Sequence, residues 1–318
     1  MTDPKLRPDQ VAAMRAMLVS SVDVRSRTAP APRVARRIGF AAVAVGAAAA
    51  VVAAVAIAVP RSETADPAAA SAMLRDAAEA TVDPSVGHGQ FLRLATTASY
   101  LALSSVDGRV ETTIGYLESQ RRDLYIPADA TARPVATTTY VAPTEFFGSG
   151  AEQFAARAST GTRDGGLVAV PVGQSSDPTR PVEDQAAMPR DPAALLRYLT
   201  DYRYQAGSSD ENVFAHVVDL LRSGTVKSDL RAALYQAIAL MPSVVITERQ
   251  ASLDGRVGTA IGLQNPERDT RQEIIIDQAT GEYIGVRLVT IDGFGEIPPG
   301  TPLEYTALSA TVVDSVPR

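Results

Sequence analysis

Residues 38–59 form an uninterrupted apolar stretch, which constrains this chain more than any other segment. They read IGFAAVAVGAAAAVVAAVAIAV, without one charged or hydrogen-bonding side chain. A helix of this length reaches roughly 33 Å, enough to cross a hydrocarbon core of about 30 Å. A buried helix of a globular domain rarely stays apolar for so long. We therefore predict a transmembrane helix over 38–59, between a head at 1–37 and a body at 60–318.

The arginines around this span predict its orientation. Those ahead of it are Arg25, Arg27, Arg33, Arg36 and Arg37. Arg61 alone follows closely, before Glu63 and Asp66. Because Lys and Arg accumulate on the cytoplasmic side of a span, we expect a single-pass protein of the cell membrane. Its N-terminus is then cytoplasmic and its body extracytoplasmic.

Two questions about the span stay open. Ala56-Ile57-Ala58 fits the pattern of a signal-peptide cleavage site, so the segment is either a retained signal-anchor or a peptide cleaved after Ala58. The long charged region ahead of the span favours the anchor. Gly39 and Gly46, among many alanines, would let two spans pack closely, so a homodimer is a further alternative.

The head contains one short amphipathic segment. Residues 8–19 have a helical pattern in which Val11, Met14 and Leu18 share one face. A helix this short is marginal by itself. We expect it either to dock on a cytoplasmic partner through those three residues or to remain a solvated tail.

Composition limits the chemistry open to the body. The chain contains no Cys, which excludes disulfides and thiolate metal sites. The formal net charge is −6, and the acidic residues are concentrated after the span, which argues against nucleic-acid binding. The body is long enough for one well-packed domain or two small ones.

The first part of the body predicts a helix followed by strands. Asp66-Pro67 is a good helix start, and the helical pattern continues to about Ala80. The expected buried stripe is Ala70, Met73, Leu74, Ala77 and Ala78. Strands are expected at 90–106 and 109–121, joined by a two-residue turn at Asp107-Gly108.

A third strand is expected at 133–141, where the sequence is β-prone. Residues 148–190 are rich in Gly, Ser, Thr, Asp and Pro. They predict a long surface loop with one short strand at 167–172.

Three helices are predicted next, with Asp191, Ser209 and Ser228 as their N-caps. Their inward-facing residues are Leu195, Leu196 and Leu199 in the first, Phe214, Val217, Val218 and Leu221 in the second, and Leu230, Ala233, Leu234, Ala237, Ile238 and Met241 in the third. Arg222 and Arg231 fall outside these stripes, so we expect them on the solvent side.

The chain then returns to strands. They are expected at 244–248, 257–263, 272–276, 283–290 and 303–313. Turn signals between them are Leu253-Asp254-Gly255-Arg256 and Gln278-Ala279-Thr280-Gly281. Strands, then helices, then consecutive hairpins indicate an α+β fold with an antiparallel sheet packed against helices. We expect strands from both ends of the body to share that sheet.

No residue pattern in the chain names a reaction. His88 and His216 lack a metal-ligand spacing, and we expect structural or solvated roles for both. The chain also lacks a nucleophile elbow and a phosphate-binding loop, so we expect no enzyme, no cofactor and no metal. Tyr198, Tyr202 and Tyr204 cluster at one helix end, where they either line a ligand or partner surface or pack against the sheet.

The middle and end of the body resemble a known family. The residues that carry the resemblance are DPAALLRYL, NVFAHVVDLLRSGTVKSDLRAALYQAIALMPSVVI, a DGR turn and IIIDQATGEYIGV. They are similar to an actinobacterial family of membrane-anchored proteins with a cytoplasmic helix, one span and an α+β ectodomain. Members are often encoded beside extracytoplasmic-function sigma factors. More loosely, the ectodomain resembles the half-barrels of lipoprotein carriers and of the periplasmic sigma-E regulator, in which a curved antiparallel sheet wraps around helices.

The topology and the resemblance together imply two alternative functions. In the first, the body is an extracytoplasmic sensor or ligand-binding domain, and the head docks a cytoplasmic regulator such as a sigma factor. In the second, the body is a membrane-anchored carrier or scaffold for lipid or peptide, without a signalling role. Zinc-type anti-sigma proteins use a His/Cys motif, which this chain cannot form without Cys.

Overall fold

A computed structural model describes residues 66–105, 107–129, 131–158, 165–169, 185–202 and 208–317. The head, with Val11, Met14 and Leu18, and the span at 38–59 lie outside these residues. Within the described residues, no helix is long and apolar enough to cross a membrane.

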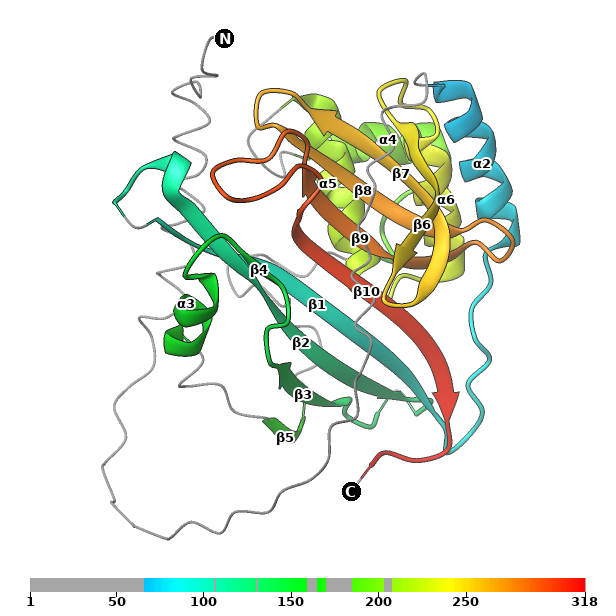
Figure 1. Ribbon diagram of the computed structural model, residues 1–318. Coiled ribbons are helices and arrows are strands. Elements are labelled where there is room, and N and C mark those ends of the chain that lie inside the picture. Colours follow the sequence, from blue (N-terminus) through cyan, green and yellow to red (C-terminus); the bar gives the residue numbers. More distant parts are fainter. Residues whose placement is uncertain are drawn as a thin grey trace, which may run out of the picture. The chain divides into compact units, whose positions relative to one another are not determined.

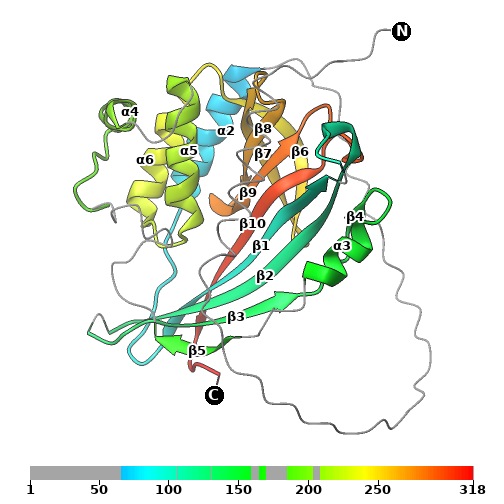
Figure 2. The ribbon, with the colours of Figure 1, turned by 90° about the vertical axis from the view of Figure 1, so that its left-hand side faces the viewer.

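In the described part of the chain, ten strands form one antiparallel sheet. They are β1 (Phe91–Ser105), β2 (Thr113–Pro127), β3 (Val135–Val141), β4 (Phe146–Phe147), β5 (Gly165–Ala169), β6 (Val245–Leu253), β7 (Arg256–Asn265), β8 (Thr270–Asp277), β9 (Glu282–Thr290) and β10 (Pro302–Val313). Their order is β5-β3-β2-β1-β10-β9-β8-β7-β6, and β4 pairs with β2. The sheet is open, with β5 and β6 at its edges, and Figure 2 shows the strand direction turning from β8 to β3.

The centre of the sheet joins the two ends of the body. Strand β1 pairs with β10 from Phe91 opposite Val313 to Tyr100 opposite Glu304. This pairing confirms that strands before and after the helices share one sheet. It also confirms the α+β class with an antiparallel sheet.

Five helices accompany the sheet in the described residues. They are α2 (Pro67–Ala80), α3 (Ala151–Ala158), α4 (Pro192–Asp201), α5 (Ser209–Arg222) and α6 (Ser228–Ile238). Figures 1 and 2 show α2, α4, α5 and α6 grouped on one face of the sheet, whereas α3 lies apart beside β2 and β4. The carboxylates of Asp66 and Asp191 cap α2 and α4 as predicted.

The main core lies between these four helices and the sheet. All the inward-facing helix residues predicted from the sequence are buried, except Leu196, which is partly buried. On the sheet side the core comprises Ile261, Leu263, Ile274, Ile276, Tyr283, Val286 and Leu308. The helical periodicity therefore identified the helix side of the core correctly.

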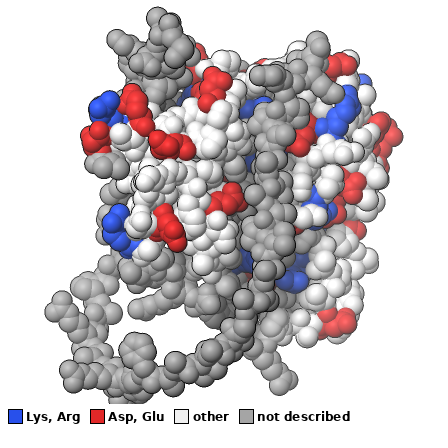
Figure 3. Space-filling view, in the orientation of Figure 1, with Lys and Arg blue, Asp and Glu red and all other residues white. Residues whose placement is uncertain are grey.

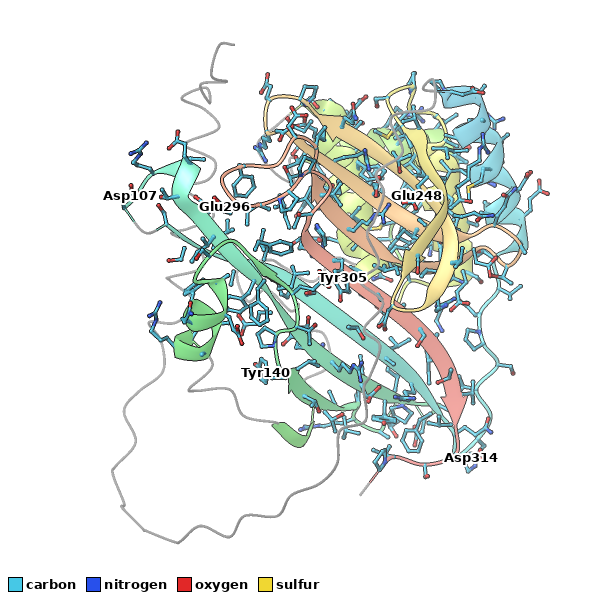
Figure 4. All side chains as sticks on the ribbon, in the orientation of Figure 1. Asp107, Tyr140, Glu248, Glu296, Tyr305 and Asp314 are labelled. Carbon is cyan, nitrogen blue, oxygen red and sulfur yellow. The ribbon has the colours of Figure 1, made fainter. Side chains whose placement is uncertain are left out.

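A smaller apolar cluster lies on the opposite face of the sheet. Its members are Ala251, Leu253, Ala260, Ile275, Ile284 and Ala307, with Tyr305 packed against them. The turn between β6 and β7 reaches this face of β1, because the Thr97 hydroxyl lies 2.9 Å from Asp254 Oδ2. The β6–β7 hairpin thus folds over neighbouring strands, and Figure 4 labels Glu248 of β6 and Tyr305 of β10.

Three local predictions were wrong. The β1–β2 connection is not a two-residue turn: Ser105 pairs with Thr113, and a 3₁₀ turn at Val110–Thr112 lies between. The stretch predicted as loop contains α3. The N-caps of α5 and α6 lie one residue before the predicted ones. Helix α5 is capped by Ser208, whose side chain and Glu211 form a capping box, rather than by Ser209. The N-cap residue of α6 is Lys227 rather than Ser228.

Candidate ligand-binding site

A cavity of about 250 Å³ lies where the helices meet the sheet. Four parts of the chain line it: the strap that follows α2, helices α5 and α6 with the turn between them, the β8–β9 turn with the start of β9, and strand β10. Its lining residues are Val82, Asp83, Pro84, Leu221, Gly224, Val226, Arg231, Thr280, Glu282, Tyr283, Leu308 and Ala310. We refer to it as the strap pocket, and to residues 81–84 as the strap.

The interior of the strap pocket is apolar. Leu221, Val226 and Leu308 are buried members of the main core. Gly224 presses the α5–α6 turn onto the sheet: its φ is +68°, and an added Cβ would lie 2.7 Å from Leu308 Cδ1 and 3.1 Å from Leu94 Cδ1. A larger residue there would push the turn away and open the pocket wall.

Two charged residues fasten the strap to α6. The carboxylate of Asp83 accepts hydrogen bonds from Ser228 N at 2.9 Å and Ser228 Oγ at 3.0 Å. Arg231 donates to the carbonyl of Val82 at 2.8 Å and to that of Val226 at 3.1 Å. Its side chain is only 17% exposed, so the expectation that Arg231 lies on the solvent side was wrong. Its long side chain reaches from outside the apolar stripe to the strap.

The rim of the pocket carries charges that are already paired. Asp83 lies 3.7 Å from Arg231, and Glu282 lies 2.8 Å from Arg256. Paired charges add little attraction for an ion in solvent. The site is therefore suited to an apolar group inside and a neutral or weakly polar group at the rim.

Tyr283 forms part of the pocket wall and is 4% exposed. Its hydroxyl and Arg222 Nε, both buried, have no hydrogen-bond partner among the described residues. Arg222 is held instead by Glu304, 2.8 Å from its Nη2. Arg222 was also predicted on the solvent side, yet it bridges α5 and β10. Burial raises the pKa of Tyr283, which stays neutral at physiological pH.

The predicted tyrosine cluster lies elsewhere. Tyr198 and Tyr202 are 38% and 36% exposed on and just after α4, and neither lines the pocket. The ring of Tyr202 lies 5.0 Å from that of buried His216, while Tyr204 is outside the described residues. His88 is exposed in the turn before β1. The structure thus brings Tyr198 and Tyr202 to a helix surface, not to a cavity.

Sequence reasoning missed the strap pocket because its lining comes from distant segments. The one local signal was Asp83-Pro84 shortly after the helix, which favours a turn or an extended segment there. Within the described ranges, no group of three or more His, Asp or Glu side chains is placed to hold a metal ion. On the face shown in Figure 3, Lys and Arg lie among Asp and Glu.

Comparison with known proteins adds no relative to this picture. No family model matches the chain, and no curated protein matches its sequence. The functional argument therefore rests on the residues and geometry described above.

Proposed function

We propose that this chain is a single-pass membrane protein whose extracytoplasmic body binds a small apolar group in the strap pocket and acts as a sensor. The observation that carries the proposal is the pocket itself, with its apolar interior and paired rim charges. The anchor and its orientation come from the apolar stretch at 38–59 and the arginines ahead of it.

The size of the pocket favours a sensor over a carrier. A cavity of about 150 Å³ accepts benzene, and sites for drug-sized ligands span about 300–1,000 Å³. At about 250 Å³ the strap pocket suits one short alkyl or aromatic group rather than several acyl chains. The sheet beyond it is also polar on the helix side, where Glu304 faces Arg222 and Arg122 is exposed.

The carrier remains the second candidate, supported by the architecture. An open antiparallel sheet with helices on one face is what a half-barrel carrier would use. In this alternative the sheet curves as a half-barrel and the apolar group belongs to a larger lipid or peptide. Mass spectrometry of molecules that copurify with the full chain distinguishes the two, since a carrier would retain lipid or peptide.

Binding can be tested with 1-hexanol as the probe. Burying about five methylene groups contributes roughly 4 kcal/mol, which corresponds to a dissociation constant on the order of 1 mM. Hexanol is titrated into the full chain in nanodiscs while the methyl NMR signals of Leu221, Val226 and Leu308 are followed. These signals should shift with saturation.

A matched pair of variants shows whether the shifts report the pocket. Ala310→Phe fills the pocket and should abolish the shifts. Ser309→Phe places the same ring on the adjacent residue of β10, which faces away from the helices. It should leave hexanol binding unchanged. Unshifted signals in the wild-type chain, or equal shifts in Ala310→Phe, would refute the site.

The signalling role that we propose depends on the head, residues 1–37. We propose that Val11, Met14 and Leu18 dock on a cytoplasmic regulator such as a sigma factor, and that the chain is not an enzyme. Met14→Asp with Leu18→Asp would place two charges in that interface, where burial is costly. Reporter transcription of the regulon should change while membrane insertion does not. An unchanged regulon and an unchanged head pull-down would favour the carrier.

A further inference from the structure

Helix α2 is in direct contact with the wall of the strap pocket. The β8–β9 turn, whose Thr280 and Glu282 line the pocket, lies against the last turn of α2. Gly281, with φ +66°, makes this approach possible, because an added Cβ would lie 2.1 Å from the Ala77 carbonyl oxygen. The Thr81 hydroxyl, at the C-cap of α2, donates to the Gly281 carbonyl at 2.8 Å.

The other end of α2 is the part of the described body nearest to the predicted span in sequence. Its N-cap, Asp66, comes shortly after residue 59. Between the two ends, the helix docks on the body through Met73, Leu74, Ala77 and Ala78, and Ser71 Oγ donates to the Ala239 carbonyl at 2.8 Å. A helix of this length covers about 21 Å. The helix is continuous from Pro67 to Ala80, where it meets the strap.

We propose that occupancy of the strap pocket is transmitted to α2, the described helix that follows the predicted span in sequence, by tightening its docking on the body. The inference rests on the proposed function and adds the element by which the same site is regulated. An occupant touches Val82 to Pro84 on the strap and Thr280 to Tyr283 on the β8–β9 turn. It therefore bridges the two segments that the Thr81–Gly281 hydrogen bond joins.

The direction of the effect follows from linkage. When the last turn of α2 opens, the strap and the β8–β9 turn separate, and the pocket loses two of its walls. A ligand that binds only the assembled pocket disfavours this opening by the factor 1 + [L]/Kd. The filled state thus holds α2 docked more firmly, and the empty state releases it more often.

Hydrogen exchange of the full chain in nanodiscs tests the transmission. With 1-hexanol at ten times its measured Kd, exchange of α2 amides should slow about tenfold, because opening is suppressed by that factor. Amides of α4, which contributes no residue to the pocket, serve as the internal reference and should change less than about twofold.

Thr81→Val separates transmission from binding. It removes the hydroxyl that donates to Gly281 and accepts from Arg231 Nε at 3.4 Å, and it keeps the shape of the side chain. Thr81 does not line the pocket, and Arg231 keeps its hydrogen bonds to the Val82 and Val226 carbonyls, so hexanol affinity should stay within about threefold. Without the Thr81–Gly281 hydrogen bond the last turn of α2 can open while the ligand-bound pocket stays assembled, so the ligand-dependent slowing in α2 should fall to less than about threefold. Thr200→Val makes the same change on α4 and should preserve the full effect.

The outcomes distinguish the two proposals. If hexanol shifts the pocket methyl signals but leaves α2 exchange unchanged, the transmission is refuted and the binding site stands. If hexanol binds and Thr81→Val retains the tenfold slowing, the Thr81–Gly281 contact is not the route. If hexanol does not bind at all, both proposals are refuted.

Discussion

The strongest test of the energetics concerns a buried ion network on β6, β8 and β9. Glu273 is fully buried and accepts hydrogen bonds from Arg271 Nε and Arg287 Nε. A second nitrogen of Arg287 donates to Glu248 at 2.5 Å. Adjacent strand residues point to opposite faces. Because Ile274 packs in the main core, Glu273 faces away from the helices.

Replacing Glu273 by Gln keeps the shape of the side chain and removes its charge. The side chains of Arg287 and Arg271 are only 5% and 11% exposed, so water cannot replace the lost carboxylate. Breaking a buried pair in this way costs about 3–5 kcal/mol, a large share of the roughly 5–15 kcal/mol that stabilises a typical domain. We expect the urea midpoint of Glu273→Gln to fall accordingly.

Urea unfolding of the full chain, followed by far-UV circular dichroism, measures the loss. The control is Asp123→Asn, which breaks the ion pair between Asp123 and Arg93. The Arg93 side chain is 38% exposed and that of Asp123 is 28% exposed. That loss should stay below about 1 kcal/mol. The double variant Glu273→Leu, Arg287→Met should lose less than the sum of its singles, since each single variant leaves one member of this pair buried without the other; Arg271 and Glu248 lose one partner each in the double variant. A Glu273→Gln loss no larger than that of Asp123→Asn would refute the reasoning.

Three further predictions concern the helix side of the body. Leu234 is fully buried, so Leu234→Ala should lower the free energy of unfolding by about 2–5 kcal/mol, against less than about 0.5 kcal/mol for Leu240→Ala at a 44% exposed position. Tyr283→Phe should raise the free energy of unfolding by about 1 kcal/mol, because the Tyr283 hydroxyl is buried without a hydrogen-bond partner among the described residues. Tyr235→Phe should lower it by a similar amount, because the Tyr235 hydroxyl donates to the Gly281 carbonyl. Urea midpoints measure both changes, and a lower midpoint for Tyr283→Phe would contradict the prediction for Tyr283. The hydrogen bond from Arg190 lowers the pKa of Asp229 below its unfolded value of about 3.9. The stabilisation from ionised Asp229 is therefore present above the unfolded pKa and is lost as the pH falls through the folded pKa. The difference in unfolding free energy between wild type and Asp229→Asn should be seen at pH 7 and vanish at about pH 2.

The sequence predicted the elements whose pattern is set by their own residues. In α5 and α6 the apolar side chains recur at helical spacing, so their buried faces follow from periodicity alone. The Asp254-Gly255 turn was likewise found, because both residues adopt the positive φ that a two-residue hairpin turn needs.

Predictions failed where individual side-chain contacts, rather than periodicity, decide the local structure. Asp107-Gly108 has the same turn chemistry, but the Asp107 carboxylate accepts from Arg109 N and Thr112 Oγ1 and holds a wider connection. Helix α3 is short and is held by Phe154, whose ring lies 5.2 Å from that of Tyr116 on β2. Neither interaction leaves a periodic trace in the sequence.

The strap pocket could not be predicted from the sequence for the same reason. A helical projection assigns Arg222 and Arg231 to the outer side because it records only the direction in which a side chain leaves the helix. It does not record that Glu304 and the strap lie within reach of the two guanidinium groups. Tyr198, Tyr202 and Tyr204 were candidate site residues because they lie close together in sequence. The residues that line the strap pocket are close together only in the folded structure.

The strap also links the pocket to the start of α6. Lys227, the N-cap residue of α6, provides no side-chain cap, and Asp83 of the strap supplies the acceptor for the Ser228 amide instead. Losing a cap of this kind costs about 0.5–2 kcal/mol. Arg231 holds the strap as well, by donating to the Val82 carbonyl. Because the Asp83 carboxylate both fastens the strap and caps the helix, an occupant of the pocket that favours the fastened strap would also stabilise the first turn of α6.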